Sequence, residues 1–263
     1  MEFNIKTVNA ITDLGKLKGA AGGHRFICDD DNDYVVKFVD FNNKIAINEL
    51  VAGSLALELG LPTPNKVLVH ISKEVIEDSP ELMTRQGQLT HLCSVLHVGS
   101  KGLPALYEDY EKLGEEKLRD KKLLNPEAMY GIVAFDNWLL NGDRNNVGNN
   151  MFGILPRDKI RYVAIDFSHG IASENWSATT LTGLMKSENP VPNFPFIENR
   201  LTDFSGFKDW IQNIEHFKDD RIESFLNSIP PEWKFDEKDK AILSDFIKTR
   251  RNIVCKVISK RMG

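Results

Sequence analysis

An acid and several amides lie close together at residues 140–150, where the sequence reads LNGDRNNVGNN. Asp143 stands early in this stretch, Asn149 and Asn150 end it, and a second acid, Asp166, closes the apolar run VAIDF that follows. Carboxylate and amide oxygens suit a hard cation such as Mg²⁺, with phosphate oxygens completing the shell. Asn149 or Asn150 would therefore hold a cation together with Asp166. Asp143 would accept a proton from a hydroxyl or orient it.

The same stretch has two other interpretations. A calcium loop of the EF-hand type starting at Asp143 is excluded, because Val147 and Ile154 stand where oxygen ligands are required. A plain polar turn stays open on this stretch alone, because Asn, Asp and Gly dominate turns in general.

A lysine inside an apolar run is the second candidate for chemistry. Lys37 lies in VVKFV, and strand alternation places it on the same face as Val35 and Val39. A buried unpaired lysine is unfavourable, so Lys37 needs a counter-charge or a bound anion. Glu49, on the first turn of the next predicted helix, is the candidate partner. The alternatives are an edge-strand lysine that faces water and a glutamate that compensates the helix dipole.

A glycine-rich link, GAAGGH, precedes this strand at residues 19–24. Backbone N–H groups at Gly22 and Gly23 could approach phosphates. The link lacks the Gly-Lys-Ser/Thr ending of a Walker A loop, and flexible loops are often glycine-rich, so it identifies no ligand by itself.

The elements that must position these residues follow from periodicity and from turn signals. In its first part the sequence predicts a hairpin at 19–40, a helix at 46–60 that Gly60 ends, and strands at 65–72 and 88–99. In its second part it predicts a helix at 125–141, which Asn125 begins as N-cap with Pro126, and a hairpin at 150–167. A proline-interrupted loop at 187–196 and two amphipathic helices at 206–228 and 236–261 follow.

Composition limits the classes of protein that fit. The 263 residues, 41% hydrophobic and 27% charged, suit one bilobal domain or two closely packed small ones. A net charge of −5 argues against a broad nucleic-acid-binding surface. Three widely spaced cysteines favour reduced thiols. With no secretion signal and no apolar run of about 18 residues, we expect a cytoplasmic protein, of bacterial origin, without a membrane partner.

The order of these features resembles the HipA-like family of bacterial kinases and, more distantly, phosphatidylinositol-type and protein kinases. A glycine-containing loop is followed by a strand lysine, a helix glutamate, an Asp-to-Asn loop and a strand-borne Asp. The segments that carry the resemblance are NEL through GLPTP (48–64), FDNWLLNGDR (135–144) and VAIDFS (163–168). The resemblance spans roughly residues 19–170, and the C-terminal helices match only in type.

The resemblance implies an α+β, bilobal protein-kinase-like fold. A small β-rich N-terminal lobe would comprise residues 1–100 and carry one helix. A larger, mainly helical C-terminal lobe would comprise residues 101–263 and carry the catalytic loop and the metal-binding hairpin. Adenine would lie against a linker near residues 91–100.

Roles for single residues also follow from the resemblance. Lys37, held in place by Glu49, would contact the phosphates of ATP, and Gly22 and Gly23 would belong to the same nucleotide-binding site. Asp143 would be the catalytic base or the acid that orients the hydroxyl, and Asp166 would hold Mg²⁺. Family loops place the metal-binding Asn five residues after the Asp, which here is Gly148. Asn150 directly precedes Met151-Phe152, the apolar strand start expected after the ligand, so we expect Asn150, with Asn149 as second choice, to bind the metal. From its length we also expect the chain to be without the extra N-terminal subdomain of full-length HipA toxins.

The activity implied is transfer of the γ-phosphate of ATP to a hydroxyl acceptor, either a protein Ser or Thr or a small-molecule or lipid alcohol. Phosphoryl transfer requires mainly positioning and charge neutralisation, which a lysine, Mg²⁺ and an aligned hydroxyl provide. The competing hypothesis is a pseudokinase-like module that binds nucleotide and recruits a partner, which the irregular Asp143-to-Asn spacing favours. The sequence does not name the acceptor.

Overall fold

The computed structural model of the protein describes residues 4–17, 23–83, 93, 95–101, 122–144, 150–155, 159–193 and 195–263. Gly22 and Asn149 lie outside the described residues, and for Asn150 only the backbone is described. Mixed α and β structure makes up the chain, with the strands concentrated in its N-terminal part.

Five strands near the N-terminus form one closed sheet. In chain order they are β1 (Thr7–Lys16), β2 (His24–Cys28), β3 (Asp33–Lys37), β4 (Lys66–His70) and β5 (His97–Lys101). Their spatial order is β1-β2-β3-β5-β4, and β4 closes the ring by pairing in parallel with β1. The predicted β2–β3 hairpin is confirmed. The last predicted strand begins at His97, later than expected. Strand β1 was not predicted.

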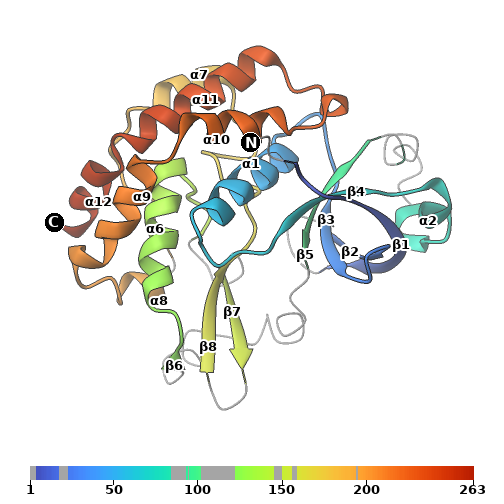
Figure 1. The fold of residues 1–263 in the computed structure, drawn as a ribbon, viewed down its shortest axis with the longest axis horizontal. Helices are drawn as coiled ribbons and strands as arrows, with labels where there is room; N and C mark the ends of the chain where they lie inside the picture. The colour runs from blue at the N-terminus through green and yellow to red at the C-terminus, as the bar shows by residue number, and fades with distance from the viewer. Residues whose placement is uncertain are drawn as a thin grey trace.

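From residue 122 onward the described chain is mainly helical, and its helices lie largely at the opposite end of the molecule from the closed sheet (Figure 1). A second sheet, of order β6-β8-β7, is formed by β6 (Lys122–Leu123), β7 (Asn150–Leu155) and β8 (Lys159–Ala164), and its β7–β8 hairpin is as predicted. The helices are α1 (Ile45–Glu58), α2 (Lys73–Glu77), α3 (Pro80–Met83), α6 (Glu127–Leu139), α7 (Ala178–Leu184), α8 (Pro195–Glu198), η5 (Phe204–Phe207), α9 (Lys208–Glu215), α10 (Asp219–Asn227), η6 (Pro231–Trp233), α11 (Glu237–Arg251) and α12 (Val254–Met262).

Helix α1 is buried on nearly all sides between the closed sheet and the C-terminal helices (Figure 1). Its sequence, IAINELVAGSLALE, is apolar all round, which is typical of a helix surrounded by protein. The helix ends where predicted, because Gly60 adopts the left-handed conformation that glycine tolerates without strain. Glu49 lies in its second turn rather than in the first turn.

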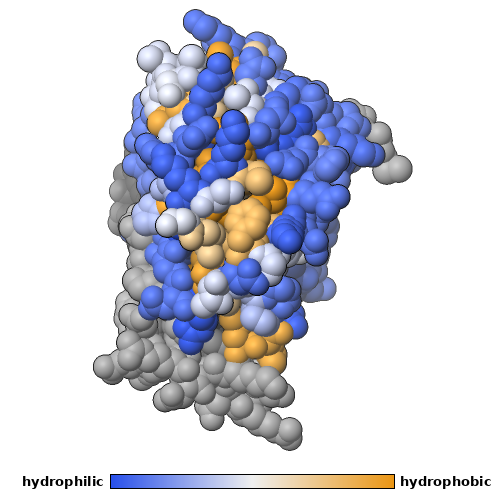
Figure 2. Space-filling view, turned by 90° about the vertical axis from the view of Figure 1, so that its left-hand side faces the viewer, coloured by the Kyte–Doolittle hydropathy of each residue, from blue (hydrophilic) through white to orange (hydrophobic). Residues whose placement is uncertain are grey.

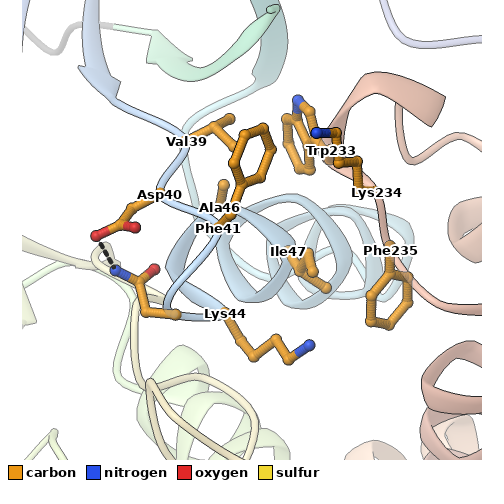
Figure 3. A pocket seen from close by; sticks show the side chains of 10 residues that line it. Val39, Asp40, Phe41, Lys44, Ala46, Ile47, Trp233, Lys234 and Phe235 are labelled. Carbon is orange, nitrogen blue, oxygen red and sulfur yellow. Dashed lines mark hydrogen bonds between the residues drawn. The ribbon is translucent and has the colours of Figure 1, made fainter. Parts of the chain in front are cut away.

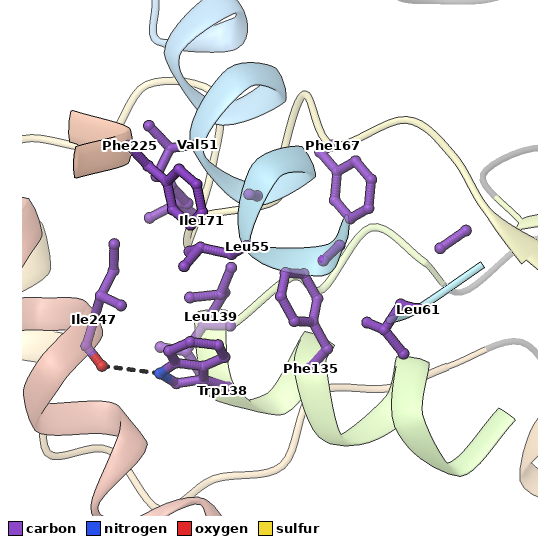
Figure 4. Close-up of a cluster of buried hydrophobic side chains, with 14 of the residues drawn as sticks. Val51, Leu55, Leu61, Phe135, Trp138, Leu139, Phe167, Ile171, Phe225 and Ile247 are labelled. Atoms are coloured by element: carbon purple, nitrogen blue, oxygen red, sulfur yellow. Dashed lines mark hydrogen bonds between the residues drawn. The ribbon is translucent and has the colours of Figure 1, made fainter. Parts of the chain in front are cut away.

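Two hydrophobic cores divide the molecule. The smaller core fills the closed sheet and includes Val36 and Ile76. The larger core joins α1 to α6, α10 and α11. Figure 4 shows Val51 and Leu55 of α1 within this cluster of aliphatic and aromatic side chains. Trp138 Nε1 donates to the carbonyl of Ile247 at 2.8 Å and so ties α6 to α11 within it. Helix α1 is therefore fixed by the same core as the loop that follows α6.

Three sequence-based expectations are corrected. The range 206–228 is divided into η5, α9 and α10, and 236–261 into α11 and α12. The second break lies at Asn252–Ile253, where Ile253 N donates to Arg250 O in a tighter turn. Asn125 does not cap α6 with its side chain. Instead the amide exchanges two hydrogen bonds of 2.8 Å with the backbone of Tyr162 on β8.

The face that carries α9 and α12 is mostly hydrophilic, with a strip of apolar surface near its middle (Figure 2). Within the described ranges, no helix combines the length and the apolar character needed to cross a lipid bilayer.

Candidate functional site

Lys37 lies between two carboxylates that come from distant parts of the chain. Its Nζ is 2.5 Å from Glu49 Oε1 and also contacts Asp166 Oδ1. Only 11% of the Lys37 side chain is exposed. Burial alone would lower the pKa of Lys37, but the charges of Glu49 and Asp166 outweigh it and raise that pKa. The alternative of a lysine facing water is therefore wrong, and the predicted Lys37–Glu49 pair is present.

Glu49 is the most enclosed member of this cluster, with 2% of its side chain exposed. Oε1 accepts from Lys37 and, at 2.9 Å, from the backbone N–H of Phe167. Oε2 accepts from a second lysine, Lys66, at 2.8 Å. Burial alone would raise the pKa of Glu49, but the two lysines lower it. Glu49 thus joins α1 to β3, to β4 and to the segment after β8.

Asp166 stands just beyond the end of β8, where the chain turns. Its φ of +54° is in the left-handed region, which is uncommon for a residue other than glycine and is concentrated at functional sites. The hydroxyl of Ser168 donates to Asp166 Oδ1 at 2.5 Å. Burial alone would raise the pKa of Asp166, but Lys37 and the Ser168 donors hold it well below its usual range. The carboxylate is therefore ionised at neutral pH and able to bind a cation.

The loop with Asp143 is anchored by its neighbour Arg144. Helix α6 ends at Leu139, and its C-cap residue Leu140 adopts a left-handed φ of +60° that turns the chain into the loop. Arg144 is fully buried and binds the carboxylate of Asp136 on α6, with Nε to Oδ2 at 2.9 Å. Its Nη1 donates to the carbonyl of Ile165 at 2.6 Å. Arg144 thereby joins the Asp143 loop to the residue before Asp166, in agreement with a structural role.

A short chain of polar contacts links the two acids. Asp143 Oδ2 is 3.2 Å from His169 Nδ1, and the same nitrogen is 3.2 Å from the Ser168 hydroxyl, which contacts Asp166. The Asp143 and His169 side chains are 41% and 37% exposed. Asp143 is thus accessible to solvent, whereas Asp166 is less exposed.

Sequence reasoning missed two buried residues of this site. Lys66 was overlooked, although it stands directly before the apolar residues of the run KVLVH. The Asn48 amide donates to the carbonyls of Ser168 and Ser173 at 2.7 and 2.9 Å. Asn48 therefore fixes the segment after Asp166 against α1. Asn48 directly precedes Glu49 in the sequence, and this position was the signal that could have identified it.

The structure brings Lys37, Glu49, Asp143 and Asp166 into one connected cluster. Gly23 directly precedes β2, and its carbonyl accepts from Leu17 N at 2.9 Å, which closes the base of the glycine-rich link. The backbone of Asn150 pairs with Ala164, two residues before Asp166, as the predicted hairpin requires. Whether Gly22, Gly23, Asn149 and Asn150 bind a ligand stays a prediction.

The oxygen donors present fit Mg²⁺ better than a softer metal. Within the described parts of the chain, no three or more His, Cys, Asp or Glu side chains form a metal-binding group. Mg²⁺ is usually held by one or two carboxylates together with waters and substrate phosphates. An ionised Asp166 that already binds a cationic group, the Lys37 ammonium, suits such a site.

A separate small pocket lies at the N-terminal end of α1, opposite η6 (Figure 3). Aromatic side chains from Phe41, Trp233 and Phe235 line it together with Lys44 and Ile47. Lys44 Nζ is 2.8 Å from Asp239 and lies over the ring of Phe235. This pocket contains no member of the Lys37 cluster.

Comparison with one solved structure supports the fold. The crystal structure of the Helicobacter pylori proinflammatory kinase CtkA matches with a TM-score of 0.60 and 13% identity, over 100% of this chain and 99% of that one. Shewanella oneidensis HipA, solved with HipB and operator DNA, matches with a TM-score of 0.38 and 13% identity, over 95% of this chain and 65% of that one. No curated protein matches the sequence.

The match to a family model is more extensive than any local motif. The model described as HipA-like kinase matches residues 17–259, which contain Lys37, Glu49, Asp143 and Asp166. This range includes the C-terminal helices, for which sequence inspection found only a likeness in type. The chain belongs to the HipA-like kinase family.

Proposed function

We propose that the protein is an ATP- and Mg²⁺-dependent kinase that transfers the γ-phosphate to a hydroxyl, with a protein Ser or Thr as the first acceptor to test. The observation that carries the proposal is Lys37 held between Glu49 on α1 and Asp166 after β8. This arrangement joins a phosphate-binding lysine to a metal-binding carboxylate. It fits a bilobal kinase in which ATP binds between residues 1–100 and residues 101–263.

Each acid has a separate task in the proposed reaction. The acceptor oxygen bonds to the γ-phosphorus as the bond to the β–γ bridging oxygen breaks, and ADP leaves. Asp143 orients the hydroxyl and takes its proton, a role that its exposure and its contact with His169 support. Lys37 neutralises phosphate charge, while Glu49 holds the lysine in place.

Asp166 and Asn150 are the residues that would hold Mg²⁺. The metal would neutralise charge on the phosphate oxygens during transfer. Asp166 contributes an ionised carboxylate, and the Ser168 donors keep that carboxylate oriented. With the Asp166 carboxylate turned to a cation, Lys37 would be available to the phosphates.

Nucleotide binding and transfer can be tested separately. Mg-ATP should raise the melting temperature of the wild type, because a ligand that binds only the folded state stabilises it. Asp166→Ala should lose most of that shift, whereas Asp209→Ala, which removes an exposed acid on α9, should keep it. No shift in the wild type at millimolar Mg-ATP would refute the proposed function.

Transfer is tested with ATP labelled at the γ-phosphate. Asp143→Ala should lower transfer to protein in a cell lysate by about a hundredfold or more, because the general base is lost, while the Mg-ATP thermal shift remains. Wild-type binding without transfer to protein, small-molecule or lipid acceptors would instead favour a nucleotide-binding interaction module.

A further inference from the structure

Glu49 has a second lysine partner that the proposed mechanism does not use. Lys66, the first residue of β4, is 2% exposed and contacts Glu49 Oε2 at 2.8 Å. Its Nζ also lies 2.7 Å from the Ser100 hydroxyl and 5.1 Å from the centre of the Phe167 ring. The two lysines therefore bind different oxygens of the same buried carboxylate.

The fold provides a specific place for this side chain. Lys66 and Ser100 are direct partners in the β4–β5 ladder, which puts both on one face of the sheet toward α1. Gly53 lies one turn after Glu49 on α1, and a Cβ there would come within 2.2 Å of Lys66 Cε. The absence of a side chain at Gly53 thus allows the lysine stem to run alongside α1 to Glu49.

The charge of the buried group depends on Lys66. Lys37 and Glu49 alone form a neutral pair, whereas Lys37, Glu49 and Lys66 together carry a net charge of +1 from two ammonium groups and one carboxylate. In this structure Asp166 balances that charge. If Asp166 instead binds Mg²⁺, the excess positive charge faces the nucleotide, and burial strengthens its attraction for phosphate.

We propose that Lys66 is a positioning residue for the nucleotide phosphates, because it holds the second oxygen of Glu49 and leaves Lys37 with an uncompensated positive charge. This inference rests on the proposed kinase function. Without Lys66, Glu49 would compete with phosphate for Lys37. The effect should therefore grow with the number of phosphates on the ligand, which a purely structural lysine would not produce.

The test is equilibrium binding of ATP, ADP and adenosine to Lys66→Met in the presence of Mg²⁺. ATP affinity should fall about tenfold, which corresponds to about 1.4 kcal/mol. ADP affinity should fall less, and adenosine affinity should not change. A lower melting temperature with an unchanged ratio of ATP to adenosine affinity would show a structural role only and overturn the inference.

Two variants at Ser100 keep the test valid if Lys66→Met does not fold. Ser100→Asp leaves the lysine stem in place but adds a negative charge beside Nζ, so it should also reduce the ratio of ATP to adenosine affinity. Ser100→Ala removes the hydroxyl without changing the charge and should leave that ratio unchanged. Lys44→Met, which removes a cation from the start of α1, is the matched charge control.

The outcomes separate the two proposals. A wild-type protein that binds no Mg-ATP overturns the kinase function and this inference together. If the ratio of ATP to adenosine affinity in both Lys66→Met and Ser100→Asp equals that of the wild type, the role of Lys66 is overturned and the kinase function is not affected.

Discussion

At the scale of single residues, the site is a group of charges that are stable only together. Lys37, Glu49 and Asp166 are all largely buried, and an isolated buried charge is strongly unfavourable. Each carboxylate has a lysine partner and a backbone N–H donor, from Phe167 to Glu49 and from Ser168 to Asp166. Removal of one partner therefore leaves the others uncompensated.

The ion pairs of Lys37 should make the protein sensitive to acid. Glu49 and Asp166 have folded-state pKa values below their ordinary values of 4.5 and 3.8. The stability that the pairs contribute is therefore fully present above those ordinary values and is lost as the pH falls through the lowered, folded-state values. Lys37→Met should be less stable than the wild type at pH 7, and this difference should shrink in strong acid.

Urea unfolding of both proteins at several pH values measures this difference. Lys256→Met, which removes an exposed lysine on α12, is the control and should be as stable as the wild type at every pH. If the stability difference between Lys37→Met and the wild type stays constant into strong acid, the lysine stabilises the fold through packing rather than through charge.

The sequence identified residues whose chemistry is unusual for their surroundings, but not all of their partners. Lys37, Glu49 and Asp166 were predicted because each is a charged residue within an apolar run. Lys66 was missed because a lysine at the start of a strand ordinarily faces water. Its burial depends on the space beside Gly53 and on the pairing of β4 with β5, both of which are set by tertiary structure.

At the scale of elements, the C-terminal end of α6 determines where the Asp143 loop begins. Arg250 on α11 is fully buried and donates to the carbonyls of Asn137 and Trp138, both at 2.6 Å, in the last turn of α6. It also donates to Leu184 and Ser187. Carbonyls at a helix end lack partners within the helix, and a cation is favourable there. Burial lowers the pKa of Arg250 to about 10, so it remains charged at neutral pH.

Arg250→Leu should therefore lower the free energy of unfolding by about 3 kcal/mol or more, because buried carbonyls lose their donors. Arg250→Lys keeps the charge but not the planar guanidinium group, and it should lower the free energy of unfolding by an intermediate amount. Denaturant unfolding at pH 7 measures both. Lys256→Leu on α12 should stay within about 0.5 kcal/mol of the wild type. An Arg250→Leu variant as stable as this control would exclude the capping role.

Elements with a strong local signal were predicted well, and those defined by distant pairing were not. Gly60 and the alternation around Lys37 locate α1 and β3 from local sequence. Strand β1 pairs with the next strand, β2, and also with β4, about 60 residues away. It was missed because some of its apolar side chains, such as Ile11, are exposed, so the strand lacks a clear apolar alternation. The breaks after α9 and α11 were missed because amphipathic periodicity continues across them.

At the scale of the whole molecule, the larger core includes residues from both predicted lobes. Leu50 and Leu55 of α1 are fully buried in the same cluster as Phe135 of α6 and Phe167. The smaller core inside the closed sheet is separate. The position of Glu49 relative to Asp166 is therefore set by the larger core, and the sequence could not show this because it depends on contacts between distant segments.

A cavity in the larger core should affect nucleotide binding more than a cavity of similar cost in the smaller one. Leu55→Ala and Ile76→Ala each remove a fully buried side chain, and each should lower the free energy of unfolding by about 2–5 kcal/mol. Leu55 lies in α1, less than two turns beyond Glu49, so its loss allows the helix to shift and weakens the alignment of Lys37 with Asp166. Ile76, in α2, belongs to the smaller core inside the closed sheet. Titration of both folded variants with Mg-ATP should show weaker binding for Leu55→Ala alone, whereas equal affinities would mean that the ion pairs hold α1 in place without the core.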